Sequence, residues 1–167
     1  MVANKLFKKE TQDSMKVLDF LDKNAVKASI KSIKKEDVIK ELVGLLASAH
    51  PIKDKASLVE TLMNRESLGS TGIGQGIGIP HAKSNCVKEL IAALGVSKNG
   101  VDFDSLDGEL TYIFMLLVAP EDAAGPHLKA LAKISRMLKD KFVRDSLIAA
   151  KDEKAILNII AQEDRKS

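Results

Sequence analysis

Three histidines, His50, His81 and His127, are the side chains in this sequence best suited to nucleophilic or acid–base chemistry at neutral pH. His81 has the least ordinary setting, because it ends the segment GIGQGIGIPH, in which glycine occupies every second position from 72 to 78. Glycine removes a side chain and permits positive φ, so a phosphate or another backbone can approach closely. Pro80 fixes the chain directly before the imidazole. The pattern predicts an exposed, firmly directed His81; a tight strand–turn–strand with a surface histidine is the structural alternative.

The glycine run matches neither of the common nucleotide-binding loops. The dinucleotide fingerprint requires a third glycine three residues after the second, and no pair among these glycines has one at that spacing. The phosphate loop requires Gly-Lys-Ser after four spacer residues, where this chain has AKS. No His/Cys cluster or carboxylate cage suggests a metal, and Asp102, Asp104 and Asp107 are typical of turn residues. We therefore expect no cofactor and no metal.

The other two histidines and one arginine have weaker local signals. His50 lies in SAHPIKD at the end of a predicted helix, where an imidazole commonly meets the negative end of the helix dipole. His127 follows EDAAGP and begins a predicted helix, where backbone N–H groups favour an anion and reduce the basicity of an imidazole. Taken alone, His127 is more typical of a capping residue. Arg65, at the end of another predicted helix, is by itself typical of a solvated charge.

Composition is that of a single aliphatic domain. The 167 residues are 45% apolar, contain no tryptophan and carry a net charge of +3. The first 35 residues contain nine lysines and four acidic residues, but no aromatic residues alternate with these lysines, so we expect a solvated face and no nucleic-acid partner. One cysteine, Cys86, fits a reducing compartment. No apolar run is long enough to cross a membrane, so we expect no membrane insertion and a cytoplasmic protein.

The periodicity predicts a small sheet between helices. Helices are expected over 34–49, 54–67 and about 127–140, followed by one or two more over 141–150 and 152–162. Strands are expected in GIGIP, in ELIAALGV, which is apolar on both faces and therefore central, and in LTYIFMLLV. Residues 1–14 are predicted to be a polar N-terminal extension, and residues 15–34 receive no firm assignment. The fold class is α/β with one domain over 15–163.

Two segments of the chain resemble a known family. NRESLGSTGIGQGIGIPHAKS and PEDAAGPHLKALAKISRML are similar to the active-site segments of type 2 IIA domains of the bacterial phosphoenolpyruvate-dependent sugar phosphotransferase system, the fructose–mannitol family. The resemblance extends over roughly residues 15–163 and implies a small mixed β-sheet flanked by helices on both sides. One departure is Gly78, where the motif usually has alanine; we expect it to loosen the strand slightly without removing a reacting group.

The resemblance assigns roles to individual residues. It implies that His81 accepts a phosphoryl group through Nε2, that Arg65 stabilises the phosphoryl oxygens and that His127 donates to those oxygens or orients His81. The family's acidic residue corresponds to Glu66. No cofactor or metal is implied. The implied donor is the phosphocarrier HPr and the implied acceptor a IIB domain, and the glycines are expected to keep the approach to His81 open for both proteins.

Two functions remain open on the resemblance. The first is phosphoryl transfer during sugar uptake, with fructose favoured because GVDFDSLDGEL and the His127 segment look closer to fructose-specific members. The second is the nitrogen-type regulatory branch, in which the phosphorylation state of the histidine controls partner proteins without sugar transport. Both require a labile phosphohistidine, and they differ in whether a IIB component takes the group.

Overall fold

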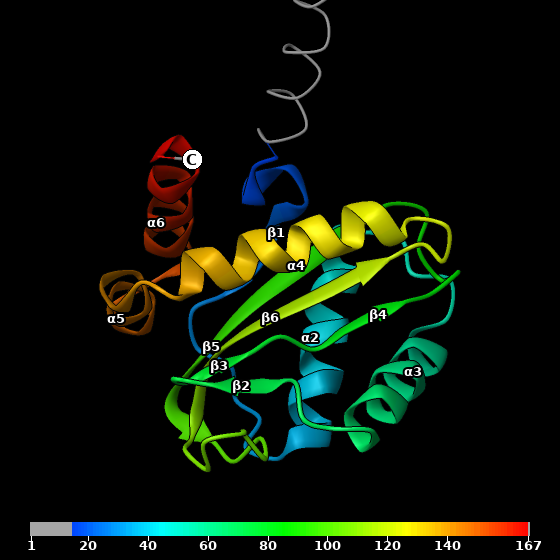
Figure 1. Ribbon diagram of the computed structural model, residues 1–167, viewed down its shortest axis with the longest axis horizontal. Helices are drawn as coiled ribbons and strands as arrows, with labels where there is room; N and C mark the ends of the chain where they lie inside the picture. The colour runs from blue at the N-terminus through cyan, green and yellow to red at the C-terminus, as the bar shows by residue number, and fades with distance from the viewer. Residues whose placement is uncertain (1–14, 167) are drawn as a thin grey trace, which may run out of the picture.

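A computed structural model describes residues 15–166, which form a six-stranded mixed sheet with helices on both faces (Figure 1). The predicted α/β fold class and the flanking of the sheet on both sides are confirmed. The predicted N-terminal extension, residues 1–14, lies outside the described residues. Within 15–166, no helix combines the length and apolar character that crossing a membrane requires.

The sheet is centred on its two longest strands, β5 (Ile91–Val101) and β6 (Thr111–Ala119), which pair antiparallel. The strand order is β1-β5-β6-β3-β2, with β1 at Leu21–Lys27, β2 at Gly72–Gly74 and β3 at Ile77–Gly78. A further short strand, β4 (His81–Lys83), continues beyond β3 and pairs parallel with the C-terminal half of β6. The central position predicted for ELIAALGV is therefore confirmed, whereas β1 and β4 were not predicted.

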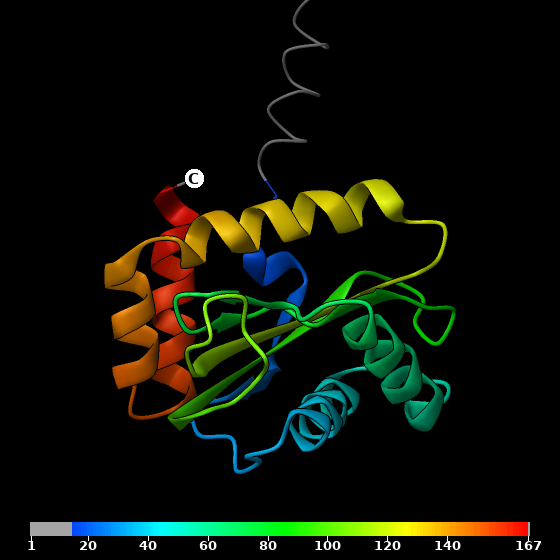
Figure 2. The ribbon, with the colours of Figure 1, turned by 60° about the horizontal axis from the view of Figure 1, so that its bottom comes forward.

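Helices cover the two faces in separate layers, which Figure 2 shows edge-on. Helices α2 (Lys35–Ala49) and α3 (Lys55–Ser67) pack on one face. The opposite face carries α4 (Ala124–Leu138), α5 (Lys141–Ala149), α6 (Glu153–Lys166) and the short 3-10 helix η1 (Val17–Asp19). Strand β6 contributes to both cores, because alternate side chains of a strand point to opposite faces.

Two helix starts matter for the site. Asp54 caps α3, because its carboxylate accepts the backbone N–H of Ser57 at 3.0 Å. Helix α4 begins at Ala124, three residues before the predicted start. Pro126 lies in the first turn, where the N–H that proline lacks would have had no partner within the helix. His127 is thus inside the first turn and does not cap the helix.

Candidate functional site

The glycine-rich segment forms a tight hairpin at the end of the sheet. Strands β2 and β3 pair antiparallel across a turn in which Gln75 and Gly76 have φ of 58° and 79°. A Cβ on Gly76 would lie 3.3 Å from the ring of Tyr112, and one on Gly72 would lie 3.0 Å from Cα of Ser105. The missing side chains therefore make room for neighbours within this chain. The glycines thus have a structural role in the hairpin, and their expected role in keeping the approach to His81 open stays a prediction.

The hairpin leads directly into the strand that carries His81. Gly78 pairs with Phe114 and His81 with Leu117, both in parallel register on β6. The carbonyl of Pro80, between the two short strands, accepts the backbone N–H of Leu117 at 3.0 Å. Ile79 is buried in the core beneath α4. His81 lies two residues further along, so its side chain points to the α4 face of the sheet.

A backbone carbonyl fixes the tautomer of His81. Its Nδ1 lies 2.7 Å from the carbonyl oxygen of Ile79. A carbonyl oxygen only accepts hydrogen bonds, so Nδ1 carries the proton and donates it. In the neutral imidazole the lone pair then belongs to Nε2. Because the side chain is half-buried rather than enclosed, Nε2 is the ring nitrogen available for nucleophilic attack.

The structure brings His127 to His81 from the opposite layer. The two ring centroids are 5.6 Å apart with the planes tilted by 49°. His127 is 8% exposed, and among the described residues its Nε2 has no hydrogen-bond partner. Burial lowers the pKa of His127, and the charges of His81 and Lys83 lower it further. An imidazole with a lowered pKa, whose Nε2 has no hydrogen-bond partner among the described residues, is therefore held next to His81.

Arg65 lies in the last turn of α3, a helix that packs against β4. Its Nη1 donates to the carbonyl oxygen of Gly69 at 2.9 Å. The structure brings the two histidines together, and among the described residues no hydrogen bond joins Arg65 to either of them. The guanidinium is half-buried and carries further N–H donors besides the one bonded to Gly69.

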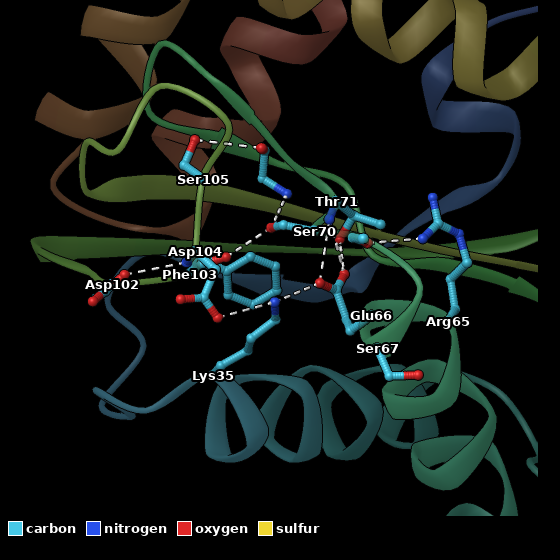
Figure 3. A network of polar contacts seen from close by, with 12 residues as sticks. Lys35, Arg65, Glu66, Ser67, Ser70, Thr71, Asp102, Phe103, Asp104 and Ser105 are labelled. Carbon is cyan, nitrogen blue, oxygen red and sulfur yellow. Dashed lines mark hydrogen bonds and ion pairs between the residues drawn. The ribbon is translucent and has the colours of Figure 1, made fainter.

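A buried polar network lies close to the Arg65 turn, and its cation, Lys35, was not predicted from the sequence (Figure 3). Glu66 is 6% exposed and forms an ion pair with Lys35 at the start of α2, with Nζ to Oε2 at 2.8 Å. Both carboxylate oxygens accept the backbone N–H of Thr71 at 3.2 Å, and Thr71 Oγ1 donates to Oε1. The Lys35 ammonium also lies 4.9 Å from the ring centroid of Phe103.

Two further polar residues, Ser70 and His50, have structural roles in the described chain. Ser70 shapes the turn, since its hydroxyl donates to the carbonyl of Phe103 at 2.8 Å and accepts the N–H of Gly72 at 2.9 Å. His50 is the C-terminal cap of α2, as its predicted position at a helix end implies, and its backbone N–H donates to Leu46.

The chain matches the family model described as "Phosphoenolpyruvate-dependent sugar phosphotransferase system, EIIA 2" over residues 19–163. It is 42% identical to the PTS system fructose-specific EIIABC component of Bacillus subtilis. The aligned region covers 90% of this chain but only 24% of that relative. It is also 33% identical to a nitrogen regulatory protein of Bradyrhizobium diazoefficiens, covering 88% of this chain and 95% of the relative.

Solved structures give the same family and fold. The nitrogen regulatory protein IIA-Ntr of Neisseria meningitidis superposes with a TM-score of 0.78 at 30% identity, covering 85% of this chain and 97% of that chain. The crystal structure of IIA mannitol from Escherichia coli superposes with a TM-score of 0.72, covering 82% of this chain and 96% of that chain. At 18% identity, this second likeness shows the fold alone.

Proposed function

The chain belongs to the type 2 EIIA family of the phosphoenolpyruvate-dependent sugar phosphotransferase system, and we propose that within it the protein carries a phosphoryl group on His81. The observation that supports this most directly is the hydrogen bond from His81 Nδ1 to the Ile79 carbonyl, which leaves the lone pair on Nε2. The facing, buried and unpartnered Nε2 of His127 provides a place for phosphoryl oxygens.

The chemistry is an in-line transfer between nitrogen nucleophiles. The Nε2 lone pair of His81 attacks the phosphorus of a phosphohistidine donor, and the donor's P–N bond breaks with its electron pair returning to the donor imidazole. Nδ1 keeps its proton throughout, so the hydrogen bond to Ile79 persists in both states. In the second half-reaction the bond from Nε2 to phosphorus breaks, and the group passes to the acceptor's nucleophile.

Neighbouring groups stabilise the charge on the transferring group. His127 is neutral because its pKa is lowered by burial, and it donates from its ring to a phosphoryl oxygen. The first turn of α4, which carries His127, adds the positive end of a helix dipole. Arg65 supplies a planar fork of donors from α3, and it reaches the phosphoryl oxygens by exchanging its bond to the Gly69 carbonyl.

The proposed donor is the phosphocarrier HPr and the proposed acceptor a IIB component for fructose. The fructose assignment is supported by the 42% identity to the Bacillus subtilis protein, whose name is fructose-specific. A second candidate function is regulation of partner proteins by the phosphorylation state of His81. It is supported by the nitrogen regulatory protein of Bradyrhizobium diazoefficiens, which this chain matches over 95% of that relative's length.

Phosphorylation with labelled phosphoenolpyruvate, the general phosphotransferase enzyme and HPr tests the carrier function. We expect an acid-labile label on the wild-type chain and none on His81→Ala. A chain that takes no label from matched partners, or a His81→Ala variant that labels normally, would contradict the proposal.

Adding a IIB acceptor then separates the two functions. Rapid loss of label from His81 to a fructose-type IIB domain, with little loss to a mannitol-type domain, is the result expected for fructose uptake. A label that is stable in the presence of every sugar-specific IIB domain would instead support the regulatory function.

A further inference from the structure

Glu66 is connected to the imidazole of His81 by a path of short polar contacts through the hairpin. The Thr71 backbone N–H donates to the Glu66 carboxylate at 3.2 Å, and the Ile79 N–H donates to the Thr71 carbonyl at 2.9 Å. The Ile79 carbonyl then accepts from Nδ1 of His81 at 2.7 Å. The residue that fixes the His81 tautomer is therefore itself anchored, through Thr71, to a buried carboxylate on α3.

We propose that Lys35 and Glu66 form a positioning pair that sets the tautomer and direction of His81 through Thr71 and Ile79. The inference rests on the proposed function, because it concerns how readily Nε2 of His81 accepts the phosphoryl group. Neither residue contacts His81: they act at a distance by holding the segment 71–79 in register. The pair joins α2 and α3 to the hairpin, and so ties the two helices to the nucleophile.

The charge and burial of the pair support a positioning role over a purely stabilising one. The Glu66 side chain is 3% exposed and that of Lys35 is 18% exposed, so both charges are largely removed from water. Removing two charges from water costs free energy that largely offsets their attraction, so a buried ion pair adds little net stability to the fold. Neutral side chains of similar size often give the same stability. A carboxylate does, however, provide two strong hydrogen-bond acceptors with fixed geometry. Here they accept hydrogen bonds from the backbone N–H and the hydroxyl of Thr71.

The same carboxylate residue also organises the turn that carries Arg65. The backbone carbonyl of Glu66 accepts the N–H of Gly69 at 3.1 Å, and the Gly69 carbonyl accepts from Arg65 at 2.9 Å. Glu66 therefore lies between the two groups assigned to the phosphoryl site, with one path to Arg65 and one to His81.

The test neutralises the pair while keeping an acceptor for Thr71. In the double variant Lys35→Met/Glu66→Gln, the amide oxygen still accepts from Thr71, but the hydrogen bond is no longer assisted by charge. We expect nitrogen NMR of His81 to show a mixture of Nδ1–H and Nε2–H tautomers, where wild type shows Nδ1–H alone. The limiting rate of phosphoryl transfer from saturating phospho-HPr should fall about 10-fold, with the half-saturating HPr concentration unchanged within about a factor of two.

A second Lys–Glu pair in the same chain is the matched control. Lys27 pairs with Glu41 at 2.9 Å, and Glu41 also accepts backbone N–H groups, those of Lys31 and Ser32. Lys27→Met/Glu41→Gln therefore removes a Lys–Glu ion pair that joins β1 to α2, away from the hairpin. It should leave the His81 tautomer and the transfer rate at wild-type values.

Thr71 variants keep the proposal falsifiable if the double variant does not fold. Thr71→Val removes only the hydroxyl that donates to Glu66, and Thr71→Ser restores it. We expect Thr71→Val to lower the limiting rate and Thr71→Ser to recover it. A folded double variant with wild-type tautomer and rate, or equal rates for the two Thr71 variants, would overturn the positioning role. If wild type itself takes no label on His81, the carrier function fails instead.

Discussion

The imidazole rings of His81 and His127 lie 5.6 Å apart, one on the short strand β4 and the other in the first turn of α4. One ring is half-buried with its tautomer fixed by a backbone carbonyl, whereas the other is buried with an unpartnered Nε2. The two histidines have the same side chain but different environments, and these environments suit His81 to the proposed role of nucleophile and His127 to the proposed role of hydrogen-bond donor.

Replacing His127 should slow transfer without preventing it. His127→Ala removes a donor to the transferring group while leaving Nε2 of His81 free, so we expect a limiting rate about 100-fold lower at an unchanged half-saturating donor concentration. Rapid-quench labelling with phospho-HPr measures both quantities. His127→Gln retains an N–H donor and should recover part of the loss; equal rates for the alanine and wild-type chains would remove His127 from the mechanism.

The lowered pKa of His127 predicts a loss of stability in mild acid. Unfolding returns the imidazole to a pKa of 6.5, so below that pH the unfolded chain binds the proton more readily than the folded chain. The stability from neutral His127 is fully present above pH 6.5 and is lost as the pH falls from there through its lowered folded pKa. Urea unfolding at a series of pH values should show this slope in wild type and a shallower one in His127→Gln. Equal slopes would contradict the assignment.

The sequence indicated the candidate site residues better than the contacts that hold them. His81, His127 and Arg65 each stand in a local motif, and the two histidines do meet in the fold. The ion pair between Lys35 and Glu66 joins two different helices, and nothing in the spacing of either helix marks a partner in the other. Such a contact is a product of tertiary packing, so local patterns do not predict it.

Short elements were missed for a related reason. Strand β4 has only three residues, too few for an alternating pattern to be read, and its pairing with β6 is what makes it a strand. The start of α4 was placed too late because Gly125 and Pro126 are typical of loops, although proline is well tolerated in a first helical turn. By contrast β6, with nine residues and an almost wholly apolar sequence, was predicted correctly.

Substitution of Arg65 separates charge from geometry. Arg65→Lys keeps the positive charge but loses the planar fork that fits phosphoryl oxygens, so we expect the transfer rate to fall about 10-fold or more. Labelling kinetics with phospho-HPr provide the measurement. Arg144→Lys is the control, since Arg144 also donates to backbone carbonyls, those of Leu138 and Lys139, but lies on α5. If Arg65→Lys transferred the phosphoryl group at the wild-type rate, a positive charge without the planar fork would be sufficient for the role proposed for Arg65.

Gly78 offers a test of how tightly β3 packs just before the strand that carries His81. A Cβ at this position would lie 3.2 Å from both Phe114 Cδ1 and Thr111 Cγ2, so the ring of Phe114 has to shift by a few tenths of an ångström to admit alanine. We expect Gly78→Ala to lower the free energy of unfolding by about 1 kcal/mol, since overpacking outweighs the reduced entropy of the unfolded chain. The reacting groups are untouched, so labelling of His81 should persist.

The control for Gly78→Ala is a glycine with free space around it. Gly44 is exposed in the middle of α2, and a Cβ there would meet nothing within 4 Å. Gly44→Ala should therefore raise the free energy of unfolding by about 0.5–1 kcal/mol, because alanine restricts the unfolded chain and favours the helix. Urea denaturation of both variants measures the difference. If Gly78→Ala stabilised the protein as much as Gly44→Ala, the ring of Phe114 would have room to move. Packing around Gly78 would then not limit which residue can stand at position 78.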